Sequence, residues 1–156
     1  MGKKLARQLG WDFIDLDYLI ENQTGKTIPE IFEKEGEPAF RDYESNALAS
    51  VLTTENLVIA VGGGTPTIAE NADHMVQSGL CVWLDAPIGM IAQRLRNAKV
   101  ERPLLTGLND EQLNEKLNRL MEDRQPAYTR SHMILSVNNL SAQGAISALK
   151  GIIQGK

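Results

Sequence analysis

Val58-Ile59-Ala60-Val61-Gly62-Gly63-Gly64-Thr65-Pro66 joins a short apolar run to three consecutive glycines. Four apolar residues in a row suit a strand that is buried on both faces, as in a parallel sheet. Glycines after such a strand let another molecule approach the backbone closely, and ligands bind at this end of the strands in open α/β sheets. A plain strand-to-helix turn is the alternative, and three glycines in a row favour the ligand loop.

On either side of this stretch, short apolar segments alternate with segments of helical periodicity. Because strands that alternate with helices form parallel sheets, the chain is predicted to be an α/β protein with a short parallel sheet. Each connection is long enough for a right-handed crossover. The expected strands are residues 13–14, 58–61, 80–84 and 133–137, and the expected helices are residues 2–9, 18–22, a helix capped by Thr27, 39–53, 67–77, a helix after Pro87, 110–128 and 141–153.

Length and charge limit the class of protein. A chain of 156 residues suits one domain with a real core, so a single domain over residues 1–156 is predicted. The net charge of -4 provides no basic field for a nucleic acid or a membrane surface, so any anion site must use local arginines. No signal peptide and no apolar run of about 20 residues is present, which favours a soluble cytoplasmic protein.

The residues that often form metal or redox sites are sparse. The one cysteine, Cys81, has no disulfide partner, and its apolar neighbours favour a small buried residue over a nucleophile. The two histidines, His74 and His132, do not have the spacing of a metal pair. These residues therefore indicate no redox centre and no histidine-based metal site.

Two pairs of charged residues stand out. Asp15 and Asp17 follow the first expected strand, where a period of two would put both carboxylates on the same side. The alternative is a strand-end turn in which an aspartate caps the next helix. Arg41 and Glu44 are three residues apart on a predicted helix and off its apolar stripe, so they can form an ion pair, or simply a solvated pair.

A loop without periodicity follows the charged end of the helix after Pro87. Residues 102–110 contain proline, glycine and turn residues, and long loops in compact domains are often lids. A mobile lid at about 99–110 is therefore expected.

Five motifs in this order strongly resemble shikimate kinase, a nucleoside-monophosphate-kinase-like P-loop enzyme, from Gly2 to near the C-terminus. They are Asp15-Leu-Asp17, Gly36-Glu37 with Phe40-Arg41-Asp-Tyr-Glu44, Gly62-Gly63-Gly64, Arg102-Pro103-Leu104-Leu105, and Arg124-Gln-Pro-Ala-Tyr128. The resemblance implies a three-layer α/β/α fold with sheet order 2-3-1-4-5. It also implies phosphorylation of the shikimate 3-hydroxyl by ATP with Mg²⁺, in aromatic amino-acid (chorismate) biosynthesis, by a monomer.

The resemblance also implies a substrate site. Asp17 matches the aspartate that binds the reacting hydroxyl, where a carboxylate can orient the oxygen and accept its proton. Arg41 and Arg124 match the arginines that bind the substrate carboxylate, for which planar guanidinium groups are suited. Gly63 matches the glycine whose N–H reaches the substrate, with Gly62 and Gly64 leaving space for it. Glu44 resembles the acid that holds Arg41 in place.

On the nucleotide side the resemblance implies fewer residues. Arg102 matches the lid arginine that closes over the nucleotide phosphates. Such an arginine can neutralise charge on the transferred phosphoryl group, which accelerates related reactions roughly 10³–10⁵-fold. Asp15 matches an aspartate near Mg²⁺ that acts through water. Arg96, or else Arg94, is the candidate residue near adenine, whereas Asn139 matches the family's adenine-contacting loop poorly.

The chain departs from the family at one motif. The family begins with a strand and G-x-x-x-x-G-K-[ST], and no such motif occurs in these 156 residues. Gly62-Gly63-Gly64 cannot replace it, because no Lys-Ser/Thr follows. By the family's topology, the absent strand lies between the strands at 58–61 and 80–84, so two buried strand edges are expected to lack partners.

Three hypotheses follow from this departure. The first is a shikimate kinase whose sequence as written is truncated or misassigned, with poor ATP binding and very slow turnover. The second is a non-catalytic paralogue that binds shikimate without the P-loop. The third is a kinase of another small hydroxy acid such as gluconate, against which the two arginines and the triple glycine argue. An in-frame P-loop upstream of codon 1 would support the first hypothesis, and a stop codon the second.

Overall fold

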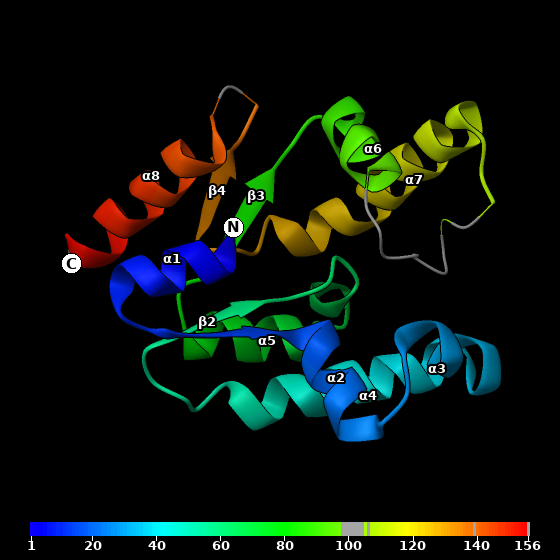
Figure 1. Cartoon of the computed structure of the whole chain (residues 1–156), viewed down its shortest axis with the longest axis horizontal. Coiled ribbons are helices and arrows are strands. Elements are labelled where there is room, and N and C mark those ends of the chain that lie inside the picture. The colour runs from blue at the N-terminus through cyan, green and yellow to red at the C-terminus, as the bar shows by residue number, and fades with distance from the viewer. Residues whose placement is uncertain (98–104, 106, 139, 156) are drawn as a thin grey trace.

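Four short strands and eight α-helices alternate along the part of the chain that the structure describes (Figure 1). The structure, a computed structural model, describes residues 1–97, 105, 107–138 and 140–155. In chain order the elements are α1 Gly2–Leu9, β1 Asp12–Asp15, α2 Leu16–Thr24, α3 Ile28–Lys34, α4 Gly36–Val51, β2 Leu57–Ala60, the 3₁₀ turn η1 Thr65–Thr67, α5 Ala69–Ser78, β3 Val82–Asp85, α6 Ile88–Arg96, α7 Asp110–Tyr128, β4 Met133–Ser136 and α8 Ala142–Gln154. The predicted α/β alternation is confirmed.

Local signals in the sequence set several of these boundaries. Thr27 and Glu30 form the reciprocal capping box at the start of α3, as predicted. Gly10 and Gly25 end α1 and α2 in the left-handed conformation that glycine adopts without strain. The prediction that α4 begins near residue 39 is wrong. The helix begins at Gly36, because Pro38 lies in its first turn, where no intrahelical N–H bond is lost.

The strands pair in parallel, but the described strands do not form one continuous sheet. β1 pairs with β2 in the register Phe13 to Val58, and β3 pairs with β4 in the register Trp83 to Ile134. The two pairs are separate two-stranded sheets. The predicted parallel pairing is confirmed, and the sheet is divided between its second and third strands.

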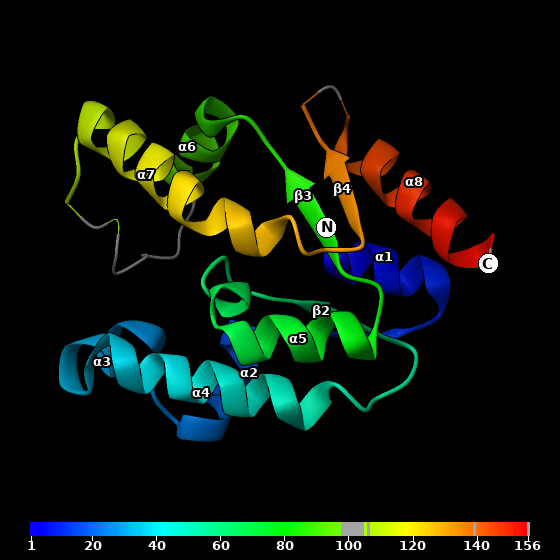
Figure 2. The same cartoon turned by 180° about the vertical axis from the view of Figure 1, so that it is seen from behind.

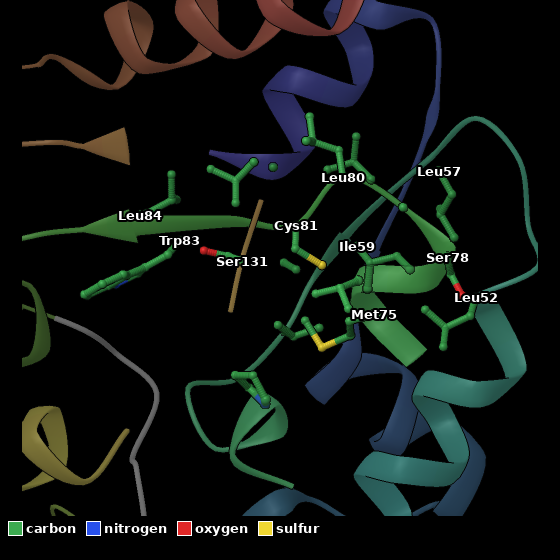
Figure 3. Close-up of a pocket in the computed structure, with 18 of the residues that line it drawn as sticks. Leu52, Leu57, Ile59, Met75, Ser78, Leu80, Cys81, Trp83, Leu84 and Ser131 are labelled. Atoms are coloured by element: carbon green, nitrogen blue, oxygen red, sulfur yellow. The ribbon is translucent and has the colours of Figure 1, made fainter. Parts of the chain in front are cut away.

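A cavity separates the two strand pairs. Its wall includes residues 57–63, which are β2 and the start of the loop after it, and residues 80–84, which lead into and include most of β3. With residues of α1, α5 and the end of α7, they line a volume of about 1030 Å³. Because successive side chains of a strand point to opposite faces, lining by consecutive residues means that the strand edges face the cavity. Figure 3 shows side chains of β2, β3 and α5, among them Ile59, Met75 and Trp83, gathered around it, together with Cys81, which directly precedes β3. We call this region the seam.

The seam changes the burial of the strands. Every residue of β2 is only partly buried, and Leu84 of β3 is 41% exposed. The prediction that these strands are buried on both faces is therefore wrong. The edges that would be covered by a neighbouring strand border the cavity instead. Cys81 is likewise only partly buried, in the cavity wall, and burial raises the pKa of its thiol above the usual value.

The largest cluster of buried apolar residues in the described part of the chain lies in the lobe formed by α2, α3 and α4, below β1 and β2 in Figure 1. Its core residues are Leu16, Ile20, Ile31, Phe40, Ala47 and Leu48. A second cluster joins α1 to α8 through Leu5, Ile146 and Leu149, beside β3 and β4 in Figure 2. Within the described ranges, no helix is long and apolar enough to cross a membrane.

Candidate functional site

The triple glycine forms the loop that leads from β2 to α5. This loop passes through η1, which contacts α4, α5 and α7, so residues from distant parts of the sequence meet there (Figure 2). It lies at the carboxyl end of β2, the end of a parallel strand at which ligands bind. The loop is therefore placed where the sequence predicts a ligand.

Each of the three glycines faces a different polar group. A Cβ atom on Gly62 would lie 3.3 Å from Glu44 Oε1 and 3.8 Å from Asp17 Oδ1. On Gly63 it would lie 2.7 Å from Tyr128 Oη and 2.8 Å from Arg124 Nη1. A Cβ atom on Gly63 would therefore have to displace the ends of the Tyr128 and Arg124 side chains.

Gly64 packs against the second arginine. A Cβ atom on Gly64 would lie 2.8 Å from Arg41 Nη2. Gly63 and Gly64 are neighbours, and their Cα atoms are about 3.8 Å apart. The Arg41 and Arg124 guanidinium groups, which come from α4 and α7, are thus brought to adjacent residues of one loop.

Arg41 is held by two acids of its own helix. Its Nη2 donates to Glu37 Oε1 at 2.7 Å, and its Nη1 donates to Glu44. The guanidinium also lies 5.3 Å from the centre of the Phe40 ring, within the range of a cation–π contact. Burial disfavours the charged form, but the hydrogen bonds to Glu37 and Glu44 outweigh it, so the pKa of Arg41 is raised above its usual value. The predicted pair of Arg41 and Glu44 forms, and Arg41 stays a cation.

Arg124 and Tyr128 reach the loop from the end of α7. Tyr128 Oη donates a hydrogen bond of 2.8 Å to the carbonyl of Gly63, and its ring lies 5.4 Å from that of Trp83. Pro126 has no N–H, so the carbonyl of Glu122, one turn earlier in α7, receives no i to i−4 hydrogen bond. Within the described part of the chain, the Arg124 guanidinium makes no ion pair, so its charge is available to an anionic ligand.

The two aspartates do not share a strand face. Asp15 ends β1 and is the N-cap of α2, where its Oδ1 accepts a hydrogen bond of 3.2 Å from the N–H of Asp17. Asp17 already lies in the first turn of the helix. The argument from a period of two is therefore wrong, because the helix begins between the two residues, and the capping alternative is the one observed. Asp17 still reaches the loop, beside Gly62.

The nucleotide-side residues are placed only in part. Arg96 ends α6, is exposed, and its Nε donates to Asp110 Oδ1 at 2.8 Å. Arg94 is exposed on the same helix. Arg102, Asn139 and most of the expected lid lie outside the described residues.

Three residues at the loop were missed by sequence reasoning as members of the site. Thr65 and Asn71 are buried polar residues behind the glycines, and Tyr128 binds Gly63. Tyr128 belongs to a motif that the sequence did single out, so its position near the loop was within reach. Nothing distinguishes Asn71 in the sequence from the exposed polar residues of the same helix.

The described residues fit Mg²⁺ and ATP only in part. They contain no group of three or more His, Cys, Asp or Glu residues that could enclose a metal ion. Mg²⁺ in phosphotransferases is usually held by one or two carboxylates, water and the substrate phosphates, and Asp15 has an exposed carboxylate for such a role. Among the described residues, the site thus contains the exposed carboxylate of Asp15 and no group of three or more such ligands.

Comparison with known proteins identifies the family of the chain. The shikimate kinase family model matches residues 1–152. The chain belongs to the shikimate kinase family. Shikimate kinase from Bacteroides thetaiotaomicron is 38% identical over 148 residues, which cover 95% of this chain and 85% of the relative. Shikimate kinase from Synechococcus sp. (strain CC9902) is 38% identical over 157 residues, which cover 98% and 80%.

Solved shikimate kinases share the fold. The crystal structure of the Bacteroides thetaiotaomicron shikimate kinase superposes with a TM-score of 0.91 at 36% identity, covering 98% of this chain and 89% of that one. Shikimate kinase from Acinetobacter baumannii in complex with shikimate gives 0.90 at 37% identity, covering 99% and 84%. The chain is thus a shikimate kinase by sequence and by structure, which is a phosphotransferase of the shikimate pathway.

Proposed function

We propose that this chain binds shikimate at the glycine loop, beside α2, α4 and the end of α7, and transfers the γ-phosphoryl group of ATP to the 3-hydroxyl. One observation carries the proposal: Arg41 and Arg124 converge on adjacent glycines of one loop. Two guanidinium groups with fixed geometry suit a small carboxylate, because each can donate two parallel N–H bonds.

In this arrangement the carboxylate of shikimate lies between Arg41 and Arg124. The N–H of Gly63 donates to the substrate, and Gly62 and Gly64 leave room for its ring. The Acinetobacter baumannii relative was solved with shikimate bound, which supports a shikimate site in this fold. A kinase of another hydroxy acid such as gluconate is disfavoured by the same family match.

Asp17 is the proposed catalytic acceptor of the proton. Its carboxylate lies beside Gly62, on the substrate side of the loop. As the 3-hydroxyl oxygen bonds to the γ-phosphorus, the bond from phosphorus to the oxygen of ADP breaks, and the hydroxyl proton passes to Asp17. Orientation of the hydroxyl by this carboxylate contributes to the rate even where proton transfer is late.

The nucleotide is assigned to Arg102 and Arg96, and the metal to Asp15. Arg102 would neutralise charge on the transferred phosphoryl group, and Arg96 would lie near the adenine. Mg²⁺, when bound, shields the phosphate charge, and Asp15 would hold it through water.

The two strand pairs are proposed to be parts of one sheet. We propose that β1, β2, β3 and β4 are strands 2, 3, 4 and 5 of a three-layer α/β/α domain over residues 1–156, with order 2-3-1-4-5. The seam supports this proposal, because the edges of β2 and β3 face it from opposite sides. Strand 1 would occupy the seam.

Product analysis tests the function. Prolonged incubation with ATP, Mg²⁺ and shikimate is expected to give shikimate 3-phosphate, identified by ³¹P NMR, far more slowly than a relative that contains G-x-x-x-x-G-K-[ST]. Phosphorylation of another shikimate hydroxyl would contradict the proposal. So would rapid phosphorylation of gluconate by a protein that does not phosphorylate shikimate.

A non-catalytic shikimate-binding protein is the second candidate. Such a protein would bind the carboxylate with the same two arginines at the glycine loop and would have no site for the nucleotide phosphates. Shikimate binding with no ATP binding and no product would establish this candidate. Tight ATP binding by the 156-residue chain would exclude it.

A further inference from the structure

Three polar side chains are buried behind the glycine loop, and each comes from a different element. Glu44 of α4 is 1% exposed, Thr65 of η1 is fully buried, and Asn71 of α5 is 3% exposed. Among the residues that the structure describes, these three are the buried polar ones. Burying polar groups is costly unless they are hydrogen-bonded, so their placement requires a specific network.

The network links α4 to the loop and the loop to α5. Thr65 Oγ1 donates to Glu44 Oε1 at 2.7 Å, and Asn71 Nδ2 donates to the carbonyl of Thr65 at 3.2 Å. Glu44 Oε2 accepts from Arg41 Nη1. Among the described residues, no buried side-chain nitrogen or oxygen lacks a partner. The two oxygens of Glu44 are therefore divided between the arginine and the threonine.

This division fixes the position of Arg41 relative to the glycines. Thr65 directly follows Gly64, which packs against the Arg41 guanidinium. Asn71 holds the main chain of Thr65, and the hydroxyl of Thr65 holds the carboxylate that binds Arg41. A shift of α4 against the loop would have to break a hydrogen bond to a charged group, and such bonds are stronger than those between neutral groups.

We infer that Thr65 is a positioning residue for the carboxylate site, acting through Glu44 on Arg41. Without the Thr65 hydroxyl, one oxygen of the buried Glu44 carboxylate loses its donor. The carboxylate then turns both oxygens to Arg41, the cation bonded to it among the described residues, and draws the guanidinium away from the ligand. The inference rests on the proposed shikimate site and adds a residue to it.

The test compares ligands with and without the carboxylate. Dissociation constants for shikimate and for shikimate methyl ester are measured by NMR titration on the full chain. Thr65→Val keeps the shape of the side chain and removes the hydroxyl. It is expected to weaken shikimate binding about tenfold and to change binding of the ester less than twofold. Thr65→Ser restores the hydroxyl and is expected to return shikimate binding to within about twofold of the wild type.

Thr24→Val is the matched control. Its hydroxyl donates to the carbonyl of Ile20 at 2.8 Å, at the end of α2. Loss of this bond is expected to lower the melting temperature and leave the ratio of the two dissociation constants unchanged. Thr65→Ala replaces Thr65→Val if the valine variant does not fold, with the same expected ratio.

The outcomes separate this inference from the proposed function. A wild-type protein that binds the acid and the ester equally well would contradict the proposed carboxylate site. A wild-type protein that prefers the acid, with a Thr65→Val protein that prefers it equally, would overturn the role of Thr65 alone. Loss of affinity for both ligands in equal proportion would show a structural role and would also overturn the inference.

Discussion

The glycine loop and the seam adjoin the same strand, β2, and they are built in opposite ways. At the loop, charged and polar side chains from α4, η1, α5 and α7 meet in paired contacts, with Glu44, Thr65 and Asn71 buried. Along the seam, the strand edges and apolar side chains border a cavity of about 1030 Å³. Close packing holds the loop in one arrangement, whereas the seam has few contacts across it.

This difference separates recognition from stability. A ligand site needs charged groups held in advance of binding, and the network around Glu44 provides this at the loop. Apolar residues stabilise a fold only where neighbours cover them, and the seam leaves strand residues half-covered. The four predictions below test the comparison, in order of expected effect.

Core truncation should distinguish the α2–α4 lobe from the seam most strongly. Ile31 is fully buried in the lobe, and Leu84 on the seam is 41% exposed. Ile31→Ala is expected to lower the free energy of unfolding by about 3 kcal/mol, because it leaves a cavity, and Leu84→Ala by about 1 kcal/mol or less. Urea denaturation measures both. Equal losses would show that the seam is as closely packed as the lobe.

Removal of an arginine should weaken ligand binding only when the arginine lies at the loop. Arg124→Ala is expected to weaken shikimate binding by roughly 100-fold, because a charged pair with the carboxylate is lost. Arg130→Ala is the matched control, since Arg130 is exposed and pairs with Asp73. Calorimetry with shikimate measures both variants. Similar losses in the two would place the carboxylate away from Arg124.

Adding a single methyl group to a glycine should weaken ligand binding at the loop and not at the seam. The Cβ of Gly63→Ala would lie 2.7 Å from Tyr128 Oη, whereas that of Gly79→Ala on the seam meets no atom within 4 Å. We expect Gly63→Ala to weaken shikimate binding about 30-fold and Gly79→Ala to change it less than twofold. Wild-type affinity in Gly63→Ala would contradict the close approach of the substrate to this loop.

The smallest effect concerns the surface of the lobe. Hydrogen bonds from Lys26 and Tyr43 lower the pKa of Glu35, so its stabilising effect is present at neutral pH and is lost as the pH falls through the lowered pKa. Because the pair is exposed, Glu35→Gln is expected to lower the melting temperature by only about 1–2 °C at pH 7. Glu33→Gln is the control without an ion pair among the described residues. A difference between Glu35→Gln and wild type that persists at pH 3 would contradict this account.

Much of the fold was predictable because the signals are local. Thr27 and Glu30 specify a helix start through hydrogen bonds within four residues, and Gly10 and Gly25 specify helix ends through their backbone conformation. The arginines and the triple glycine were predictable through the family resemblance. The Arg41–Glu44 pair also follows from helical spacing.

The remaining features depend on long-range packing. The buried Glu44 accepts a hydrogen bond from Thr65, twenty-one residues later, and no periodicity predicts that contact. The spacing of Asp15 and Asp17 gave the wrong geometry, since α2 starts between them. The apolar composition of the strands does not tell which edges are paired, but the family's topology did predict that the facing edges of β2 and β3 lack a partner, as observed.

A crystal structure of this chain with shikimate tests the central claim most directly. The account predicts that the shikimate carboxylate lies between Arg41 and Arg124, with N–O distances of about 2.7–3.2 Å, and that the 3-hydroxyl faces Asp17. Shikimate bound in the seam, or bound at the loop with its hydroxyls against the two arginines, would contradict it.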